Sequence, residues 1–149
     1  HKNRHYERRI LAGIEAGGKP IFPTGRVGTR GLVRHLRTGG IISILLDEKS
    51  AEGVSLPFLG IGALTSLSAA QLALKYDLPM IPAYGIRTED GNGFRVEFEA
   101  PIAHTDSVAM TCAFNDSLSA RIIANPDQWY WMLRRWGGQT EATLSTYQA

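Results

Sequence analysis

Residues 41–48 read Ile-Ile-Ser-Ile-Leu-Leu-Asp-Glu, and the predicted fold depends on this stretch. A short apolar run, rich in β-branched residues and preceded by Gly39-Gly40, is typical of a strand covered on both faces. The run ends on Asp47 and Glu48, which places two acids at the carboxyl end of the expected strand. Ligands of open α/β sheets bind at that edge, so Asp47 is a candidate site residue.

Segments on both sides of this stretch carry helical periodicity. Apolar side chains at spacings of three and four predict helices over residues 6–17, 30–37, 65–76 and 106–124. The last of these has four apolar residues at intervals of four, namely Met110, Phe114, Leu118 and Ile122. This spacing predicts one face of the helix that packs into the core.

Two further segments predict an antiparallel hairpin over residues 79–86 and 94–98. In the second segment Phe94, Val96 and Phe98 alternate with charged residues, so we expect these three side chains to point into the core. Residues 49–64 contain three glycines and a proline, which favours an irregular loop. Thr65 follows that loop and is expected to cap the next helix.

Together these elements predict an α/β fold with a mixed, mainly parallel sheet flanked by helices. A continuous apolar strand needs cover on both faces, and helices supply it. The 149 residues suit a single compact domain, and the composition of 44% hydrophobic and 20% charged residues excludes a disordered chain. Residues 137–149 are expected to form a frayed tail.

Charge is distributed unevenly along the chain. Residues 1–40 hold nine basic and two acidic side chains, a net charge of +7, whereas the remainder holds seven basic and twelve acidic ones, a net charge of −5. The basic part is expected to meet phosphates, an acidic carrier protein or a membrane surface. A solvated basic face with no partner is the alternative. No stretch approaches the ~20 consecutive apolar residues of a membrane-spanning helix.

Most catalytic motifs are absent from the sequence. A hydroxyl acceptor needs a base, usually a histidine oriented by a carboxylate, but none of the four histidines is followed five residues later by an acid. There is no Gly-x-Ser-x-Gly elbow and no phosphate-binding glycine loop. One cysteine and scattered histidines lack the spacing of metal ligands. The sequence predicts no metal, nucleotide or other cofactor.

Five motifs follow one another in a specific order. They are Gly25-Arg26; Leu46-Asp47-Glu48; Gly53 to Gly60, which reads Gly-Val-Ser-Leu-Pro-Phe-Leu-Gly; Leu78 to Pro82; and residues 125–136, which end on Gln-Trp-Tyr-Trp-Met-Leu-Arg-Arg-Trp. In this order they resemble the lipid A biosynthesis (lauroyl/myristoyl) acyltransferases, part of the lysophospholipid acyltransferase-like group. The resemblance implies a glycerolipid acyltransferase-like fold. It also implies that the chain is the C-terminal part of a larger domain, with a His-x4-Asp/Glu motif upstream.

The resemblance implies three kinds of site residue and no catalytic residue within this chain. Substrate-binding roles are implied for Arg26, Asp47, Arg87, Arg134 and Arg135. The pocket wall is implied to consist of Pro57, Phe58, Gly60 and Pro82. Tryptophan favours the membrane interface, so interfacial positions are implied for Trp129, Trp131 and Trp136.

The implied activity moves an acyl chain from acyl-carrier protein to a hydroxyl of a phosphorylated glycolipid precursor in lipopolysaccharide biosynthesis. Acyl-carrier protein, the lipid A precursor and the cytoplasmic face of the inner membrane are the implied partners, and no nucleic acid is expected. The chain by itself is expected to be inactive. Two alternatives stay open: transfer to another acceptor, such as a phosphatidylinositol mannoside or a lysophospholipid, and a non-catalytic module that binds anionic lipid.

Overall fold

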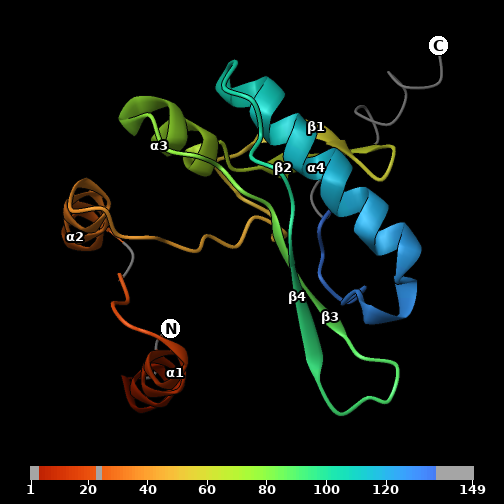
Figure 1. Ribbon diagram of the computed structural model, residues 1–149, viewed down its shortest axis with the longest axis horizontal. Helices are drawn as coiled ribbons and strands as arrows, with labels where there is room; N and C mark the ends of the chain where they lie inside the picture. Colours follow the sequence, from red (N-terminus) through yellow and green to blue (C-terminus); the bar gives the residue numbers. More distant parts are fainter. Residues whose placement is uncertain (1–3, 23–24, 137–149) are drawn as a thin grey trace. The chain divides into compact units, whose positions relative to one another are not determined.

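The computed structural model describes residues 4–22 and 25–136, which form two compact units that divide after Ser43. The first unit contains two helices, α1 (Arg4–Gly17) and α2 (Arg26–Arg37) (Figure 1). The expected helix ends at Gly17 and Arg37 are confirmed, and α2 begins four residues earlier than predicted. The prediction that residues 1–149 form one domain stays a prediction, and the expected tail lies outside the described residues.

Helix α2 buries one side through a small aromatic contact. The rings of Phe22 and His35 lie 5.6 Å apart, and Leu36 of the same helix is buried. At the C-terminus of α2 the backbone N–H of Gly40 donates to His35 O. A Cβ at Gly40 would lie 2.3 Å from the His35 ring, so a larger residue there would displace that ring.

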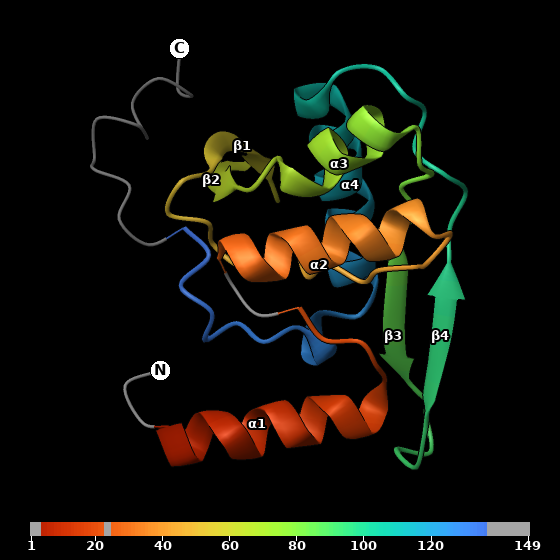
Figure 2. The same cartoon turned by 90° about the vertical axis from the view of Figure 1, so that its left-hand side faces the viewer.

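The second unit contains two helices, a short 3-10 helix and four strands. These are β1 (Val54–Phe58), β2 (Ile61–Thr65), α3 (Ser68–Tyr76), β3 (Ala83–Arg87), β4 (Phe94–Phe98), α4 (Ser107–Ala124) and η1 (Pro126–Gln128). Each strand pairs only with its neighbour along the chain, which gives two separate antiparallel hairpins. Helix α4 packs against β1 and α3 packs against α4 (Figure 2).

The β1–β2 hairpin occupies the segment that was expected to be a loop. Leu59 and Gly60 form its two-residue turn, with φ of +49° and +78°. Positive φ at both positions is the geometry of a type I′ turn, whose twist matches antiparallel strands. This conformation is unfavourable for leucine. Its cost is offset because Leu59 packs on the core and its N–H donates to Ser119 Oγ at 3.1 Å.

The β3–β4 hairpin is confirmed, but the predicted face of β4 is wrong. Phe94, Val96 and Phe98 are 65%, 60% and 73% exposed, whereas Glu97 and Glu99 on the other face are half-buried. The two glutamates turn toward α4 because Arg121 of that helix binds both of them. Alternation located the strand correctly, yet the ion pairs decide which face turns inward.

The core of the second unit lies between α4 and the hairpins. Phe58, Ala63, Tyr84, Leu118 and Ile122 form the main cluster, and Ala70, Ala73 and Met110 form a second cluster where α3 meets α4. The predicted inward face of α4 is confirmed, since Met110, Leu118 and Ile122 are buried. Asp106 caps this helix by accepting hydrogen bonds from the N–H groups of Val108 and Ala109.

The predicted mainly parallel sheet is wrong. Only two small antiparallel sheets are found among the described residues, and no parallel strands are paired there. Residues 41–46 run without a β-ladder, with Ile41 92% and Leu45 80% exposed and only Leu46 buried. An apolar β-branched run indicates a strand, but a strand forms only where another backbone supplies hydrogen bonds. Among the described residues, no other strand pairs with residues 41–46.

Candidate functional site

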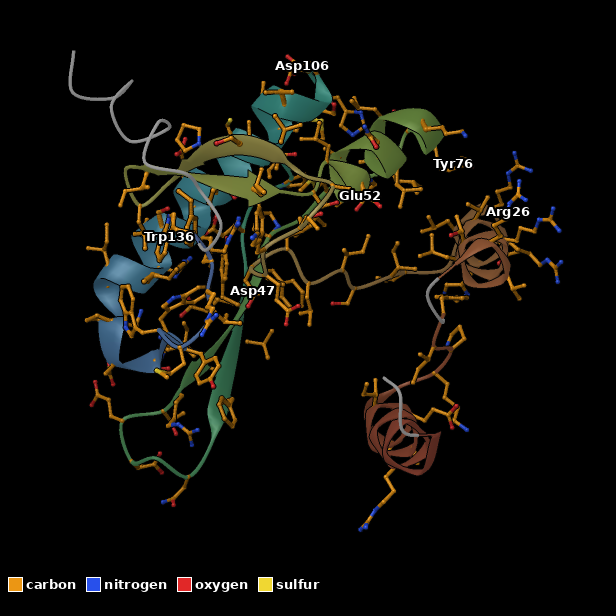
Figure 3. All side chains as sticks on the ribbon, turned by 180° about the vertical axis from the view of Figure 1, so that it is seen from behind. Arg26, Asp47, Glu52, Tyr76, Asp106 and Trp136 are labelled. Carbon is orange, nitrogen blue, oxygen red and sulfur yellow. The ribbon has the colours of Figure 1, made fainter. Side chains whose placement is uncertain are left out.

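A group of four polar residues lies at the end of β2, and we call it the buried polar cluster: Asp47, Thr65, Asn115 and Arg135. Thr65, Asn115 and Arg135 are at most 1% exposed, and Asp47 is half-buried. Thr65, Asn115 and Arg135 come from segments far apart in the sequence and meet at Thr65 Oγ1. Asp47 is included because its charge opposes the lowering of the Arg135 pKa. Asp47 and the neighbouring Trp136 are labelled in Figure 3.

Arg135 is the central member of the buried polar cluster. Its Nη1 donates to Leu64 O at 2.8 Å and its Nη2 to Thr65 Oγ1 at 2.7 Å. The guanidinium also lies over the Phe58 ring, 4.9 Å from the ring centre, which is a cation–π contact. Burial lowers the pKa of Arg135 from its ordinary value, and the charge of Asp47 opposes this shift.

Thr65 and Asn115 connect Arg135 to the β1–β2 hairpin. Asn115 Nδ2 donates to Pro57 O at 2.9 Å and lies 3.5 Å from Thr65 Oγ1. The Thr65 hydroxyl donates to Ala63 O at 3.0 Å, inside β2. Thr65 therefore belongs to a strand, and the expectation that it caps α3 is wrong, since Leu67 holds the N-cap position.

Asp47 stands at the start of a loop that folds onto the end of β2. Its Oδ1 is buried and has no hydrogen-bond partner among the described residues. The loop is anchored by Ser50, whose N–H donates to Leu64 O at 3.1 Å. Gly53 continues the contact, because a Cβ there would lie 2.6–2.8 Å from Thr65 backbone atoms. The loop thus needs glycine to approach β2 this closely.

Aromatic side chains from the end of the chain cover one side of the cluster. The Phe58 ring lies 6.0 Å from the ring of Trp129 and 5.5 Å from that of Trp136, and both tryptophans are half-buried. Trp131 differs, since it is 54% exposed and donates its Nε1–H to Pro126 O. The three tryptophans predicted at a membrane interface therefore differ in exposure, and their role there stays a prediction.

The other predicted site residues do not join the buried polar cluster. Arg87 is exposed at the end of β3, with its guanidinium 4.7 Å from the centre of the Phe94 ring, and Arg134 is also exposed. Pro82 is buried and accepts a hydrogen bond from Glu99 N at 3.0 Å, while Gly60 forms the hairpin turn. Their predicted substrate and pocket roles stay predictions.

Arg26 lies in the first unit, where it begins α2. It is exposed, as are Arg30 and Arg34 on the following turns, and we call these three residues the arginine stripe. No ion pair of these three is found among the described residues, and α2 contains no acidic residue. The surface between Gly25, Arg26, Thr29, Arg30 and Val33 forms an open hollow. Figure 3 labels Arg26 on this helix.

Sequence reasoning missed an ion-pair network between β4 and α4. Arg121 binds Glu97, and its Nη2 lies 2.7 Å from Glu99 Oε1. Ser117 donates to Glu99, which is the main reason that the pKa of Glu99 falls below its usual value, with Arg121 adding to the effect. The Tyr84 hydroxyl lies 2.8 Å from Ser117 Oγ. Ser117 and Arg121 are four residues apart on α4, so their side chains lie on the same face of the helix. This spacing was the sequence signal that could have indicated the network.

Among residues 4–22 and 25–136, no group of three or more His, Cys, Asp or Glu side chains could hold a metal ion. No helix in this part of the chain is long and apolar enough to cross a membrane.

Comparison with known protein families gives a match over most of the chain. Residues 1–137 match the family described as bacterial lipid A biosynthesis acyltransferase, and the match includes every residue of the buried polar cluster. A search of curated proteins found no match to the chain. Since the matched segment covers most of the 149 residues, the chain belongs to this family.

Proposed function

We propose that the protein carrying this chain, as a member of the bacterial lipid A biosynthesis acyltransferase family, transfers an acyl chain from acyl-carrier protein to a hydroxyl of a phosphorylated lipid A precursor. The observation that carries this proposal is the match over residues 1–137. The thioester of the carrier is the acyl donor in this scheme. No further cofactor takes part in it.

The base in this proposal is a His-x4-Asp/Glu pair upstream of His1. None of the four histidines of this chain is followed five residues later by an acid, so the chain does not supply the pair. Such a base removes the proton from the acceptor hydroxyl as the hydroxyl oxygen attacks the thioester carbonyl. The ester C–O bond forms, the C–S bond breaks, and the proton passes to the departing thiolate of the carrier. The 149 residues alone therefore bind substrate without turning it over.

Asp47 and the exposed arginines are assigned to substrate binding. Asp47 lies at the edge of the buried polar cluster, where its half-buried carboxylate accepts a hydrogen bond from the acceptor sugar. Arg26, Arg87 and Arg134 are exposed, which leaves their guanidinium groups open to bidentate contact with lipid phosphates. Arg135 belongs with Asp47 and acts from within the protein, because its side chain is 1% exposed.

The pocket wall in this proposal is formed by the β1–β2 hairpin and the start of β3. Phe58 is 1% exposed and Pro82 is buried, so these two support the wall from behind, while Pro57 and Gly60 are exposed at its surface. The enzyme works at the cytoplasmic face of the inner membrane, where its lipid acceptor is held. Trp131 is exposed and suits the interface, as do the neighbouring Tyr130 and Met132.

The test is an acyl-transfer assay with the full-length protein, acyl-carrier thioester and a lipid A precursor. We expect turnover by the wild type, and a loss of at least tenfold in Asp47→Ala and in Arg26→Ala, with both variants folded. Arg95→Met is the matched control, because Arg95 is an exposed arginine paired with Glu97 outside the proposed site. Normal turnover in both Asp47→Ala and Arg26→Ala would refute the assigned roles.

A second candidate, a non-catalytic module that binds anionic lipid, is favoured by the arginine stripe. Like charges at i and i+4 destabilise a helix by about 0.2–0.5 kcal/mol per pair, and Arg26, Arg30 and Arg34 form two such pairs. An anionic partner offsets this repulsion. Vesicle binding that weakens in Arg30→Gln/Arg34→Gln, combined with no acyl transfer by the full-length protein, would favour the module. Turnover would favour the enzyme.

A further inference from the structure

Arg135 carries a charge that is almost completely removed from water. Its side chain is 1% exposed, and no carboxylate oxygen lies within ion-pair distance of it among the described residues. Neutral acceptors satisfy Nη1 and Nη2, but Nε is buried and has no hydrogen-bond partner in this part of the chain. An uncompensated buried charge is strongly unfavourable, so a nearby anion is needed to stabilise it.

Burial lowers the pKa of Arg135, and the negative charge of Asp47 opposes this shift. Asp47 Oδ1 is buried and, like Arg135 Nε, has no hydrogen-bond partner among the described residues. One orphaned atom is a donor and the other is an acceptor, so they are chemically complementary.

The same backbone carbonyl holds Arg135 and the loop of Asp47. Leu64 O accepts from Arg135 Nη1 at 2.8 Å and from Ser50 N at 3.1 Å. Ser50 follows Asp47 by three residues, and the N–H of Gly53 donates to Ser50 O at 3.0 Å, which closes the loop. A shift of Arg135 therefore changes the anchor of the loop as well as the charge beside it.

We propose that Arg135 is a positioning residue for Asp47, which it holds by charge and through the shared Leu64 carbonyl. This inference rests on the proposed function, because the role of Asp47 at the acceptor comes from there. It changes the role of Arg135 from a ligand of lipid phosphate to a buried support of the acid. Lysine cannot replace it fully, since one ammonium does not reach Leu64 O and Thr65 Oγ1 with the fixed fork of a guanidinium.

The first test measures coupling without using activity. Urea unfolding of the full-length wild type, Asp47→Asn, Arg135→Met and the double variant forms a double-mutant cycle. Methionine keeps much of the unbranched stem near Phe58 and removes the charge. We expect Asp47→Asn to lower the folding equilibrium constant at least tenfold more when Arg135 is present than when it is methionine.

The second test measures the rate of acyl transfer with the same variants. Because Arg135 acts through Asp47, we expect Arg135→Met to lower kcat/KM at least tenfold. We also expect the double variant to be no more than threefold slower than Asp47→Asn alone. Arg135→Lys should recover part of the rate, since it restores the charge. Arg95→Met again serves as the control for loss of an arginine charge at the surface.

The outcomes separate this inference from the proposed function. Losses that multiply in the double variant, or coupling below twofold in the unfolding cycle, would overturn the positioning role. If Arg135→Met does not fold, the cycle is run with Arg135→Gln, which also removes the charge, and the same twofold limit applies. If the wild type shows no acyl transfer, the proposed function fails, while the unfolding cycle still decides whether the two residues are coupled.

Discussion

Alanine at position 53 is expected to destabilise the protein, because the Asp47 loop touches the end of β2 there, backbone against backbone. An added Cβ would lie 2.6 Å from Thr65 O and 2.7 Å from its carbonyl carbon. Side-chain tips can rotate away from such a contact, but backbone atoms cannot. The loop must therefore move away from β2, which lengthens the hydrogen bond from Ser50 N to Leu64 O.

The size of the effect follows from two opposing terms. Overpacking of this kind costs about 1–3 kcal/mol, and the reduced freedom of alanine in the unfolded chain returns about 0.4–1 kcal/mol. We expect Gly53→Ala to lower the free energy of unfolding by about 1–2 kcal/mol. Gly85→Ala is the matched control, because no atom lies within 4 Å of its added Cβ. It should gain about 0.4–1 kcal/mol.

Urea unfolding of the two variants checks this prediction. The midpoint should fall in Gly53→Ala and rise or stay unchanged in Gly85→Ala, with equal slopes in both transitions. Both substitutions reduce the freedom of the unfolded chain in the same way, so the difference between the two midpoints reports the contact at position 53. A midpoint that rises in Gly53→Ala, or falls equally in both variants, would refute the close contact between the loop and β2.

Three further substitutions test the packing around α4. Asp106→Ala removes the N-cap of α4 and should lower the free energy of unfolding by about 1 kcal/mol, measured by urea unfolding. Tyr84→Phe removes the hydrogen bond to Ser117 and should lower it by about 0.5–1.5 kcal/mol in the same assay. Arg121→Met should destabilise the protein most near pH 7. The folded state holds the pKa values of Glu97 and Glu99 below their usual range. The stability that these two carboxylates contribute is therefore present above their unfolded-state pKa. It is lost as the pH falls through their folded-state pKa values. Thermal melts from pH 7 to pH 3 should show the wild type and Arg121→Met converging, and a constant difference would contradict the network.

The helix α4 and the second hairpin were predictable from the sequence because their signals are local. Asp106 is a strong N-cap residue, and the spacing of four from Met110 to Ile122 gave the inward face of the helix. The alternation from Phe94 to Phe98 gave a strand in the same way. The alternation predicted the wrong inward face of β4. Which face turns inward depends on Arg121, which lies more than twenty residues away in the sequence.

The other errors have a common physical cause, which is that a strand or turn depends on a partner elsewhere in the chain. Residues 41–46 have the composition of a strand and no backbone partner among the described residues. The turn between β1 and β2 is Leu59-Gly60, which is not one of the pairs, such as asparagine-glycine, that indicate a hairpin turn. Leu59 has a positive φ, which leucine avoids in isolation. Only the contacts of Leu59 with the core and with Ser119 make this conformation favourable.

The motif order pointed to two of the four members of the buried polar cluster, Asp47 and Arg135, and gave nothing of their arrangement. Asp47, Phe58 and Arg135 were all expected at the site from the motif order, and the structure brings Phe58 and Arg135 into contact, with the charge of Asp47 acting on Arg135. Asn115 was missed, since a polar residue in the middle of a helix carries no signal that it reaches Pro57 O. The burial of Arg135 was also invisible, because arginine is usually exposed.

Acylation of a lipid A precursor by this protein is tested most directly on the lipid A of the bacterium that carries its gene. Mass spectrometry should show that deletion of the gene removes one acyl chain from lipid A or its precursor. The wild-type gene should restore that chain, whereas Asp47→Ala at equal protein level should not. Unchanged lipid A in the deletion strain, or full restoration by Asp47→Ala, would contradict the account.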